Sequence, residues 1–276
     1  MLKNVVMFLK NKKQAVILAA LLIVIAVLIC VSLFGKGKRE SETETEISEA
    51  TAESCKYDWS RLTDKDGRYY YSDGEVRASL CIDVSEHQGD IDWKKVRDDG
   101  VKYAFIRVGY RGYMSGIINL DKKFDANMRG ASTAGIKTGV YFFSQAINES
   151  EAKEEAEYTL KQAGKYAVEL PIVFDMEYVT SGDRIDGLTK EEKTAVASAF
   201  CDAVLSGGYQ ALIYGNSAWL TGDIDVVKAS EYGLWLALYT KENTFPYDFS
   251  IWQYASNGKV DGIDANVDMN LIFEDY

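Results

Sequence analysis

Four acidic residues stand where short apolar segments end, which is a common place for catalytic carboxylates in alternating α/β proteins. They are Asp83 after Leu-Cys-Ile, Asp175 and Glu177 in the segment IVFDMEY, and Asp268 in NVDMN. Because Asp175 and Glu177 are two residues apart, their side chains point to the same face of a strand. Each raises the pKa of the other, which suits one of them to act as a general acid. Ordinary surface acids at a strand end are the alternative interpretation.

Aromatic residues occur at the same segment ends and point to the ligand class. Aromatic rings stack on the apolar faces of sugars, while carboxylates and amides reach the hydroxyl groups. At least half of these aromatic residues are expected to belong to the core. Substrate contacts are predicted for Tyr110, Tyr141, Tyr214, Trp235, Trp252 and the amide of Gln253. The combination of carboxylates and aromatic residues indicates a carbohydrate ligand.

The elements that must position these residues alternate between strand and helix. Strands are predicted at Leu80–Ser85, Tyr103–Gly109, Thr138–Ser144, Pro171–Glu177, Ala211–Tyr214, Gly233–Tyr239, Ser250–Tyr254 and Ala265–Asn270. Helices are predicted at Asp92–Asp99, Asp121–Ala134, Ser150–Tyr166 and Thr189–Ser206. Eight strands with intervening helices favour a closed parallel barrel over an open doubly wound sheet. The Tyr-rich residues 57–79 are expected to form an extra hairpin or loop.

Charge and composition exclude several classes of function. The 276 residues carry a net charge of −11, and residues 40–276 alone hold 24 basic and 42 acidic residues, a net charge of −18. So acidic a region is a poor candidate for binding nucleic acid. One histidine and four cysteines without a CxxC pair argue against a zinc centre, so neither a metal nor a cofactor is expected. Cys55 and Cys81 could form a disulfide, which would leave Cys201 unpaired.

The first 54 residues differ in character from the rest of the chain. Residues 15–34 are twenty positions without a charge, long enough to cross a hydrocarbon core of about 30 Å as a helix. An uncleaved transmembrane anchor is favoured over a signal peptide, with residues 1–14 as a short basic cytoplasmic segment. Residues 35–54 are expected to be an acidic, disordered linker. The catalytic domain is then predicted to span residues 55–276.

Six separated segments resemble the lysozymes of glycoside hydrolase family 25. They are DVSEHQGDIDW (83–93), YAFIRVGY (103–110), GVYFFSQA (139–146), PIVFDMEY (171–178), LWLALYT (234–240) and IWQYASNGKVDGIDANVDMN (251–270). The resemblance implies an irregular (β/α) TIM-like barrel, here preceded by a single N-terminal transmembrane helix. It also implies hydrolysis of the β-1,4 bond between N-acetylmuramic acid and N-acetylglucosamine in peptidoglycan. One departure is Leu238, where the family often has a polar or aromatic residue.

Carried over by position, the resemblance assigns roles to the four acids. Glu177 becomes the general acid/base, Asp175 stabilises the substrate's acetamido group, and Asp83 and Asp268 complete the acidic set. The resemblance favours a substrate-assisted, retaining route, whereas an inverting route with Asp83 or Asp268 activating water stays open. A triad built on Ser85 and His87 is disfavoured, because they are two residues apart and no G-x-S-x-G elbow exists.

The expected partners and location follow from this assignment. Peptidoglycan strands are the expected substrate, and the catalytic domain is expected to be monomeric and to face the wall from a single-pass anchor in the cell membrane. Local wall remodelling is the expected role. A catalytically inactive glycan-binding protein on the same barrel is the alternative function.

Overall fold

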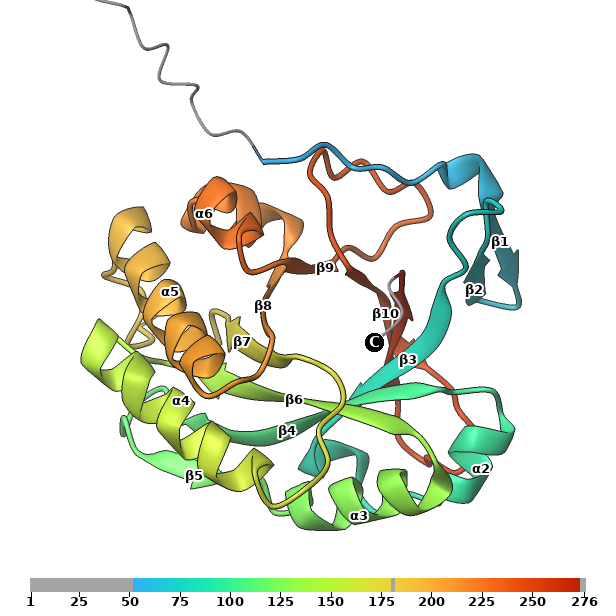
Figure 1. Ribbon diagram of the computed structural model, residues 1–276, viewed down its shortest axis with the longest axis horizontal. Helices are drawn as coiled ribbons and strands as arrows, with labels where there is room; N and C mark the ends of the chain where they lie inside the picture. The colour runs from blue at the N-terminus through green and yellow to red at the C-terminus, as the bar shows by residue number, and fades with distance from the viewer. Residues whose placement is uncertain (1–51, 180–181, 274–276) are drawn as a thin grey trace, which may run out of the picture. The chain divides into compact units, whose positions relative to one another are not determined.

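A closed eight-stranded barrel forms the centre of the protein (Figure 1). The computed structural model describes residues 52–179 and 182–273. The barrel strands are β3 (Ser79–Val84), β4 (Tyr103–Arg111), β6 (Lys137–Ser144), β7 (Ile172–Met176), β8 (Ala211–Asn216), β9 (Leu234–Ala237), β10 (Ile251–Gly258) and β11 (Val267–Ile272). Their order is β3-β11-β10-β9-β8-β7-β6-β4, and the pairing of β3 with β4 closes the ring. The predicted barrel is therefore confirmed.

The expectation of an all-parallel barrel is wrong at one strand. β11 runs antiparallel to both of its neighbours, β10 and β3. The connection from β10 to β11 contains no helix, and a short return of this kind produces an antiparallel pair. The beginning of β11 consequently lies at the end of the barrel where the parallel strands finish. This reversal brings Asp268 opposite Asp83 in the strand register.

Helices lie on the outer side of the barrel (Figure 1). They are α2 (Trp93–Asp98), α3 (Phe124–Ala134), α4 (Glu149–Ala163), α5 (Lys190–Ser206) and α6 (Val226–Ser230), with a short β5 (Ile118–Leu120) beside β4. At the start of α5, the Thr189 side chain accepts from the backbone N–H of Glu192, and the Glu192 side chain accepts from the backbone N–H of Thr189. This capping box fixes where α5 begins. No helix joins β9 to β10, so the barrel is irregular.

The inside of the barrel is packed with side chains, so it is not a channel. Phe105 and Trp235 lie there with their ring centroids 4.7 Å apart, and both are buried. Gly139 makes this packing possible, because a Cβ at that position would lie 2.3 Å from the Phe105 ring. Any ligand must therefore bind at an end of the barrel. Cys81 belongs to this interior, and the disulfide considered for Cys55 is absent: both thiols are free.

A two-stranded hairpin, β1 (Leu62–Lys65) and β2 (Arg68–Tyr71), confirms the extra hairpin predicted within residues 57–79. Its turn uses Asp66 and Gly67, both with positive φ, as tight hairpins require. The hairpin is attached through aromatic contacts, such as Tyr69 stacked on Tyr254 with centroids 4.6 Å apart. It lies outside the barrel next to β3 (Figure 1).

The predicted segments 1–14 and 15–34, and most of the predicted linker 35–54, lie outside the described residues. Within residues 52–179 and 182–273, no helix is both long enough and apolar enough to cross a membrane.

Candidate active site

A cleft of about 270 Å³ opens where the parallel strands end and β11 begins. The structure brings all four predicted acids into it. Its lining residues are Asp83, Ser85, His87, Gln88, Arg107, Tyr141, Phe143, Asp175, Glu177, Tyr214, Trp235, Tyr239, Gln253 and Asp268. The acids come from three separate strand ends, so only the closed barrel places them together. The function of each residue remains a prediction.

Asp175 and Glu177 form one hydrogen-bonded pair at the end of β7. Asp175 is buried and donates to Glu177, and burial together with the negative charges of Glu177 and Asp83 holds the pKa of Asp175 well above its usual range. Burial and the charge of Asp83 raise the pKa of Glu177 to about 6, opposed by the bond from Asp175. The pair therefore holds a proton near neutral pH. Asp175 Oδ1 has no hydrogen-bond partner within the described part of the chain.

The backbone around Glu177 is held from the neighbouring strand end. Gln145, which follows β6, donates through Nε2 to the Glu177 carbonyl oxygen at 2.8 Å. Arg184 in turn donates to the Gln145 carbonyl at 2.8 Å and pairs with Glu151 on α4. The position of the Glu177 backbone therefore depends on contacts that reach the outer helices.

Asp83 and Asp268 form the second carboxyl pair. Asp268 donates to Asp83, and burial and the Asp83 charge raise the pKa of Asp268 to about 9. Burial also raises the pKa of Asp83, opposed by hydrogen bonds from Asn270, Gln253 and Asp268. Asp83 is thus the carboxylate in this pair and Asp268 its proton donor.

Two amides fix the Asp83 carboxylate. Its Oδ2 accepts from Gln253 Nε2 at 2.9 Å and from Asn270 Nδ2 at 2.8 Å. Trp235 Nε1 donates to Asn270 Oδ1 at 2.8 Å and so sets which way that amide points. Trp235 and Gln253 were predicted to contact substrate, which stays a prediction; the structure shows that they position Asp83.

Two tyrosines set the orientation of the Gln253 amide. Tyr214 and Tyr239 donate to Gln253 Oε1 at 3.0 Å and 2.6 Å. Tyr214 is buried, whereas Tyr239 is 55% exposed and forms part of the cleft wall. Tyr141 also lines the cleft. Burial and the negative charge of Asp83 hold the pKa of Tyr141 well above its usual range.

Two residues predicted to contact substrate do not lie in the cleft. Trp252 is fully buried, donates to the Leu238 carbonyl at 2.9 Å and packs against Trp59 of the N-terminal segment. Tyr110 lies beneath the guanidinium of Arg107, 5.3 Å from its ring centroid, but does not line the cleft. Successive side chains on a strand point to opposite faces. Because Gln253 on β10 faces the cleft, its neighbour Trp252 faces away from it.

Sequence reasoning missed Arg107 and Asn270. Arg107 lines the cleft, binds the buried Asp121 at 2.8 Å and lowers the pKa of Asp175. It is the one charged residue in the apolar segment YAFIRVGY, and that was a usable signal. Asn270 lies in the recognised D-x-N motif, but its contact with Asp83 depends on the antiparallel pairing of β11.

The serine–histidine pair considered in the sequence serves a local structural purpose. Ser85 caps a short 3-10 helix, Glu86–Gln88, and its hydroxyl accepts from the His87 backbone N–H. Within residues 52–179 and 182–273, no group of three or more His, Cys, Asp or Glu side chains is arranged to hold a metal ion.

Comparison with known proteins identifies the family. The model of glycosyl hydrolases family 25 matches residues 82–263, which is more than half of the chain. The chain belongs to glycosyl hydrolase family 25. The match includes Asp83, Asp175 and Glu177. Asp268 and Asn270 lie just beyond the match, and both form hydrogen bonds with Asp83, which lies inside it.

Individual lysozymes and an autolysin are similar to this chain. Lysozyme M1 of Streptomyces globisporus is 30% identical over 201 residues, covering 68% of this chain and 66% of the relative. The modular autolysin LytC of Streptococcus pneumoniae, solved with a synthetic peptidoglycan ligand, superposes with a TM-score of 0.64 at 28% identity, covering 76% of this chain and 51% of that one. A bacterial lysozyme from Streptomyces coelicolor gives 0.61 at 26% identity, with coverages of 71% and 92%. The chain thus spans about two thirds of lysozyme M1 and half of LytC.

Proposed function

We propose that this family 25 protein is a peptidoglycan hydrolase that cleaves the β-1,4 bond from N-acetylmuramic acid to N-acetylglucosamine. The observation that carries the proposal is the Asp175–Glu177 pair, which holds a proton in a cleft that also contains a fixed carboxylate, Asp83. A glycosidic oxygen needs a proton donor as its bond breaks, and an adjacent anion stabilises the positive charge that develops on the sugar. The names of the relatives add the peptidoglycan substrate.

Glu177 is the proton donor in this mechanism. Glu177 is less buried than Asp175 and lines the cleft just after β7, where a glycosidic oxygen can reach it. As the bond between the anomeric carbon and the glycosidic oxygen breaks, the electron pair stays on the oxygen and the Glu177 proton moves to it. Glu177 is then a carboxylate and can remove a proton from the water that completes hydrolysis.

Asp175 assists the substrate's own 2-acetamido group. In the substrate-assisted route, the acetamido oxygen attacks the anomeric carbon and the resulting ring carries a positive charge. Oδ1 of Asp175 is buried and has no hydrogen-bond partner within the described part of the chain, and we assign it as the acceptor of the acetamido N–H. For Asp175 to become the anion, the shared proton moves to Glu177, and Glu177 needs that proton for its own step.

The surroundings of Asp83 favour this route over inversion. A general base that activates water needs a lone pair free to take the proton. Asp83 Oδ2 already accepts two amide hydrogens, and Asp268 donates a third to the same carboxylate. Asp268 itself is protonated near neutral pH. Both candidate bases of the inverting route are thus engaged, and we assign Asp83 the role of a fixed negative charge.

The test is digestion of purified peptidoglycan by the full-length protein, followed by borohydride reduction and mass spectrometry of the released fragments. Reduced ends at N-acetylmuramic acid are expected, with loss of at least about 10²-fold in rate for Glu177→Gln, since general acid catalysis contributes about 10²–10⁴-fold. Glu157→Gln on the exposed side of α4 is the matched control and should keep full activity.

Two results would contradict the proposal in different ways. Reduced ends at N-acetylglucosamine would retain a hydrolase and reject the bond assignment. Binding of peptidoglycan with no release of fragments would replace the enzyme with the inactive glycan-binding alternative.

The location is part of the same proposal. Residues 15–34 would anchor the protein in the cell membrane with the N-terminus inside and the barrel toward the wall, acting in local wall remodelling. Fractionation and external protease treatment of intact cells test this arrangement. Protein in the membrane fraction with the barrel open to protease is expected, whereas protein free in the medium and cut near residue 35 would overturn it.

A further inference from the structure

Basic side chains gather around the β1–β2 hairpin, on a part of the molecule that shares no residue with the catalytic cleft. Two adjoining cavities there, of about 490 and 560 Å³, both border Arg68, Tyr70 and Asp99. We call them together the hairpin trough. Its basic residues are Arg61, Lys65, Arg68, Arg77, Lys102 and Lys259, and its acids are Asp66 and Asp99. This excess of positive charge stands on a domain whose overall charge is strongly negative.

The trough runs along the outside of the barrel. The first cavity reaches the start of β3 at Ser79 and Lys102 just before β4, which is the end of the barrel opposite the cleft. The second follows the end of β10, including Asn257 and Lys259. Most of its basic residues precede the family match at residue 82, so the trough is a feature of this chain's own N-terminal hairpin.

The pairing of these basic groups shows which of them are available. Arg68 is engaged, because its guanidinium binds both carboxylate oxygens of Asp99 at 3.1 and 2.8 Å. Arg77 and Lys102 are exposed, and among the described residues neither has a carboxylate within ion-pair distance. The Lys65 ammonium lies 5.3 Å from the Tyr70 ring centroid. Lys94, an exposed lysine on α2, differs in having an acidic partner, Asp98, at 2.8 Å.

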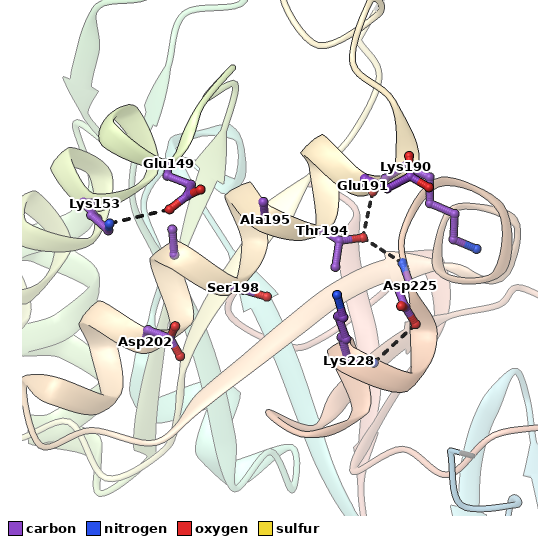
Figure 2. A pocket seen from close by; sticks show the side chains of 11 residues that line it. Glu149, Lys153, Lys190, Glu191, Thr194, Ala195, Ser198, Asp202, Asp225 and Lys228 are labelled. Carbon is purple, nitrogen blue, oxygen red and sulfur yellow. Dashed lines mark hydrogen bonds and ion pairs between the residues drawn. The ribbon is translucent and has the colours of Figure 1, made fainter. Parts of the chain in front are cut away.

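A second groove illustrates the contrast. Between α4, α5 and α6, a cavity of about 380 Å³ is lined by both signs of charge (Figure 2). Figure 2 shows Lys153 paired with Glu149, and the Asp225 side chain accepting from the Lys228 backbone N–H. Four acidic residues and three lysines line this groove. The hairpin trough differs, because six basic residues there stand against two acids.

We propose that the hairpin trough is a binding site for a linear polyanion whose charges are phosphate groups. Guanidinium and ammonium groups bind phosphate oxygens strongly, and arginine does so with two parallel hydrogen bonds. The hydroxyls of Tyr70, Ser72 and Ser79 also border the trough and supply further donors for the several oxygens of each phosphate. Two adjoining cavities that share Arg68, Tyr70 and Asp99 as lining residues fit a chain of charges better than one small ion.

The site gives the protein a second attachment to its surroundings, independent of the cleft. An enzyme held by an anionic polymer on one side would present its cleft to neighbouring glycan from a fixed distance. Since the binding residues and the cleft do not overlap, occupancy of the trough leaves the catalytic groups unblocked.

The experiment measures binding of linear inorganic polyphosphate to the full-length protein by fluorescence anisotropy at low ionic strength. Arg77→Gln with Lys102→Gln is expected to weaken binding at least about tenfold, and added salt should weaken wild-type binding steeply. The matched control is Lys94→Gln with Lys161→Gln, which removes the same charge from exposed helix positions outside the trough. Because the first 39 residues carry seven further basic residues, the difference between the two double variants carries the test.

Further probes distinguish the class and source of the ligand. Poly-glutamate should bind at least about tenfold more weakly than polyphosphate, and equal binding would reject phosphate as the recognised group. The proposed ligand is a linear phosphate polymer without bases. Preference for a single-stranded oligonucleotide over polyphosphate would therefore make this a nucleic-acid site, and binding only to vesicles of anionic phospholipid would make it a membrane contact. Both outcomes overturn the proposal, as does equal weakening in the two double variants. Peptidoglycan digestion should be unchanged in either variant, so failure here is separable from failure of the proposed function.

Discussion

Asp268 and Asp83 face each other across the pairing of β11 with β3, and the carboxyl of Asp268 donates a hydrogen bond to the carboxylate of Asp83. This relationship depends on the single antiparallel strand of the barrel. It keeps one of the two groups protonated at neutral pH and leaves the negative charge on the other. Each of them can therefore be tested separately by its effect on stability and on activity.

Replacing Asp268 by asparagine should change how stability depends on pH. The pKa of Asp268 is about 9 in the folded protein, above the ordinary carboxyl value, so from about pH 4 to 9 the folded state holds a proton that the unfolded chain has lost. The wild type should therefore lose stability as pH rises through this interval. The amide of the Asp268→Asn variant does not titrate, and the Tm of this variant at pH 8 should exceed the wild-type value by at least about 2 °C, the shift expected for about 1 kcal/mol.

Thermal unfolding of both proteins at pH 5 and pH 8 measures this difference. Asp264→Asn, an exposed acid on the connection before β11, is the control and should follow the wild type. A parallel decline of Asp268→Asn and wild type would show that Asp268 is ionised in the folded protein.

The Asp175–Glu177 pair should impose an acidic limb on the activity profile. The productive form holds one proton, because Glu177 must donate while Asp175 carries a charge. A second proton is added with the Glu177 pKa of about 6, so kcat/KM should fall about tenfold per pH unit below that value. Loss of the remaining proton lowers the rate at higher pH, because the pKa of Asp175 is raised well above its usual range.

Asp175→Asn separates the two titrations. With an amide at position 175, only Glu177 titrates, and its protonated form is the only possible donor. The acidic limb should disappear, and the lower remaining activity should fall as pH rises. Initial rates on soluble peptidoglycan fragments between pH 4 and 9 decide the matter. An acidic limb that survives in the variant would assign it to another group.

Trp235→Phe should reduce turnover through Asn270. The substitution removes the N–H that holds Asn270 Oδ1, so the amide that donates to Asp83 is no longer fixed. An unpaired buried acceptor costs about 1–3 kcal/mol of stability. We expect kcat to fall about tenfold, which corresponds to about 1.4 kcal/mol, with a smaller change in KM.

Trp252→Phe is the matched control for this prediction. Trp252 is equally buried and also donates one hydrogen bond, but to the backbone of Leu238 on a different network. It should lower Tm as Trp235→Phe does and leave kcat unchanged. Equal losses of kcat in the two variants would mean that turnover only follows general stability.

The sequence predicted the barrel and the acids because both depend on local pattern. Apolar segments of strand length gave all eight barrel strands within four residues of their observed bounds, and carboxylates at segment ends are visible without a structure. The direction of β11 was not predictable in this way, since it depends on the short connection after β10. The contact of Asn270 was missed for the same reason, because its amide reaches Asp83 only when β11 runs antiparallel.

The aromatic residues show a second limit of sequence reasoning. Trp235 and Trp252 occur in similar apolar segments, and both were predicted to contact substrate. On β9, Trp235 points into the barrel toward the cleft, whereas Trp252 on β10 points outward against the N-terminal segment. Which face a strand residue takes depends on the register of its neighbours. Residue type and spacing alone do not supply that register.

The final prediction concerns Tyr214 and Tyr239, which donate to the same oxygen of Gln253. Either bond alone is enough to keep Oε1 of the amide toward the tyrosines and Nε2 toward Asp83. Tyr214→Phe or Tyr239→Phe alone should therefore reduce kcat by less than about threefold. The double variant frees the amide to rotate, and its kcat should fall by at least about thirtyfold, a coupling of about 0.7 kcal/mol or more. Michaelis parameters for the four proteins on soluble peptidoglycan fragments form the cycle. If the two single effects multiply to give the double effect, the tyrosines act independently on substrate and do not share control of Gln253.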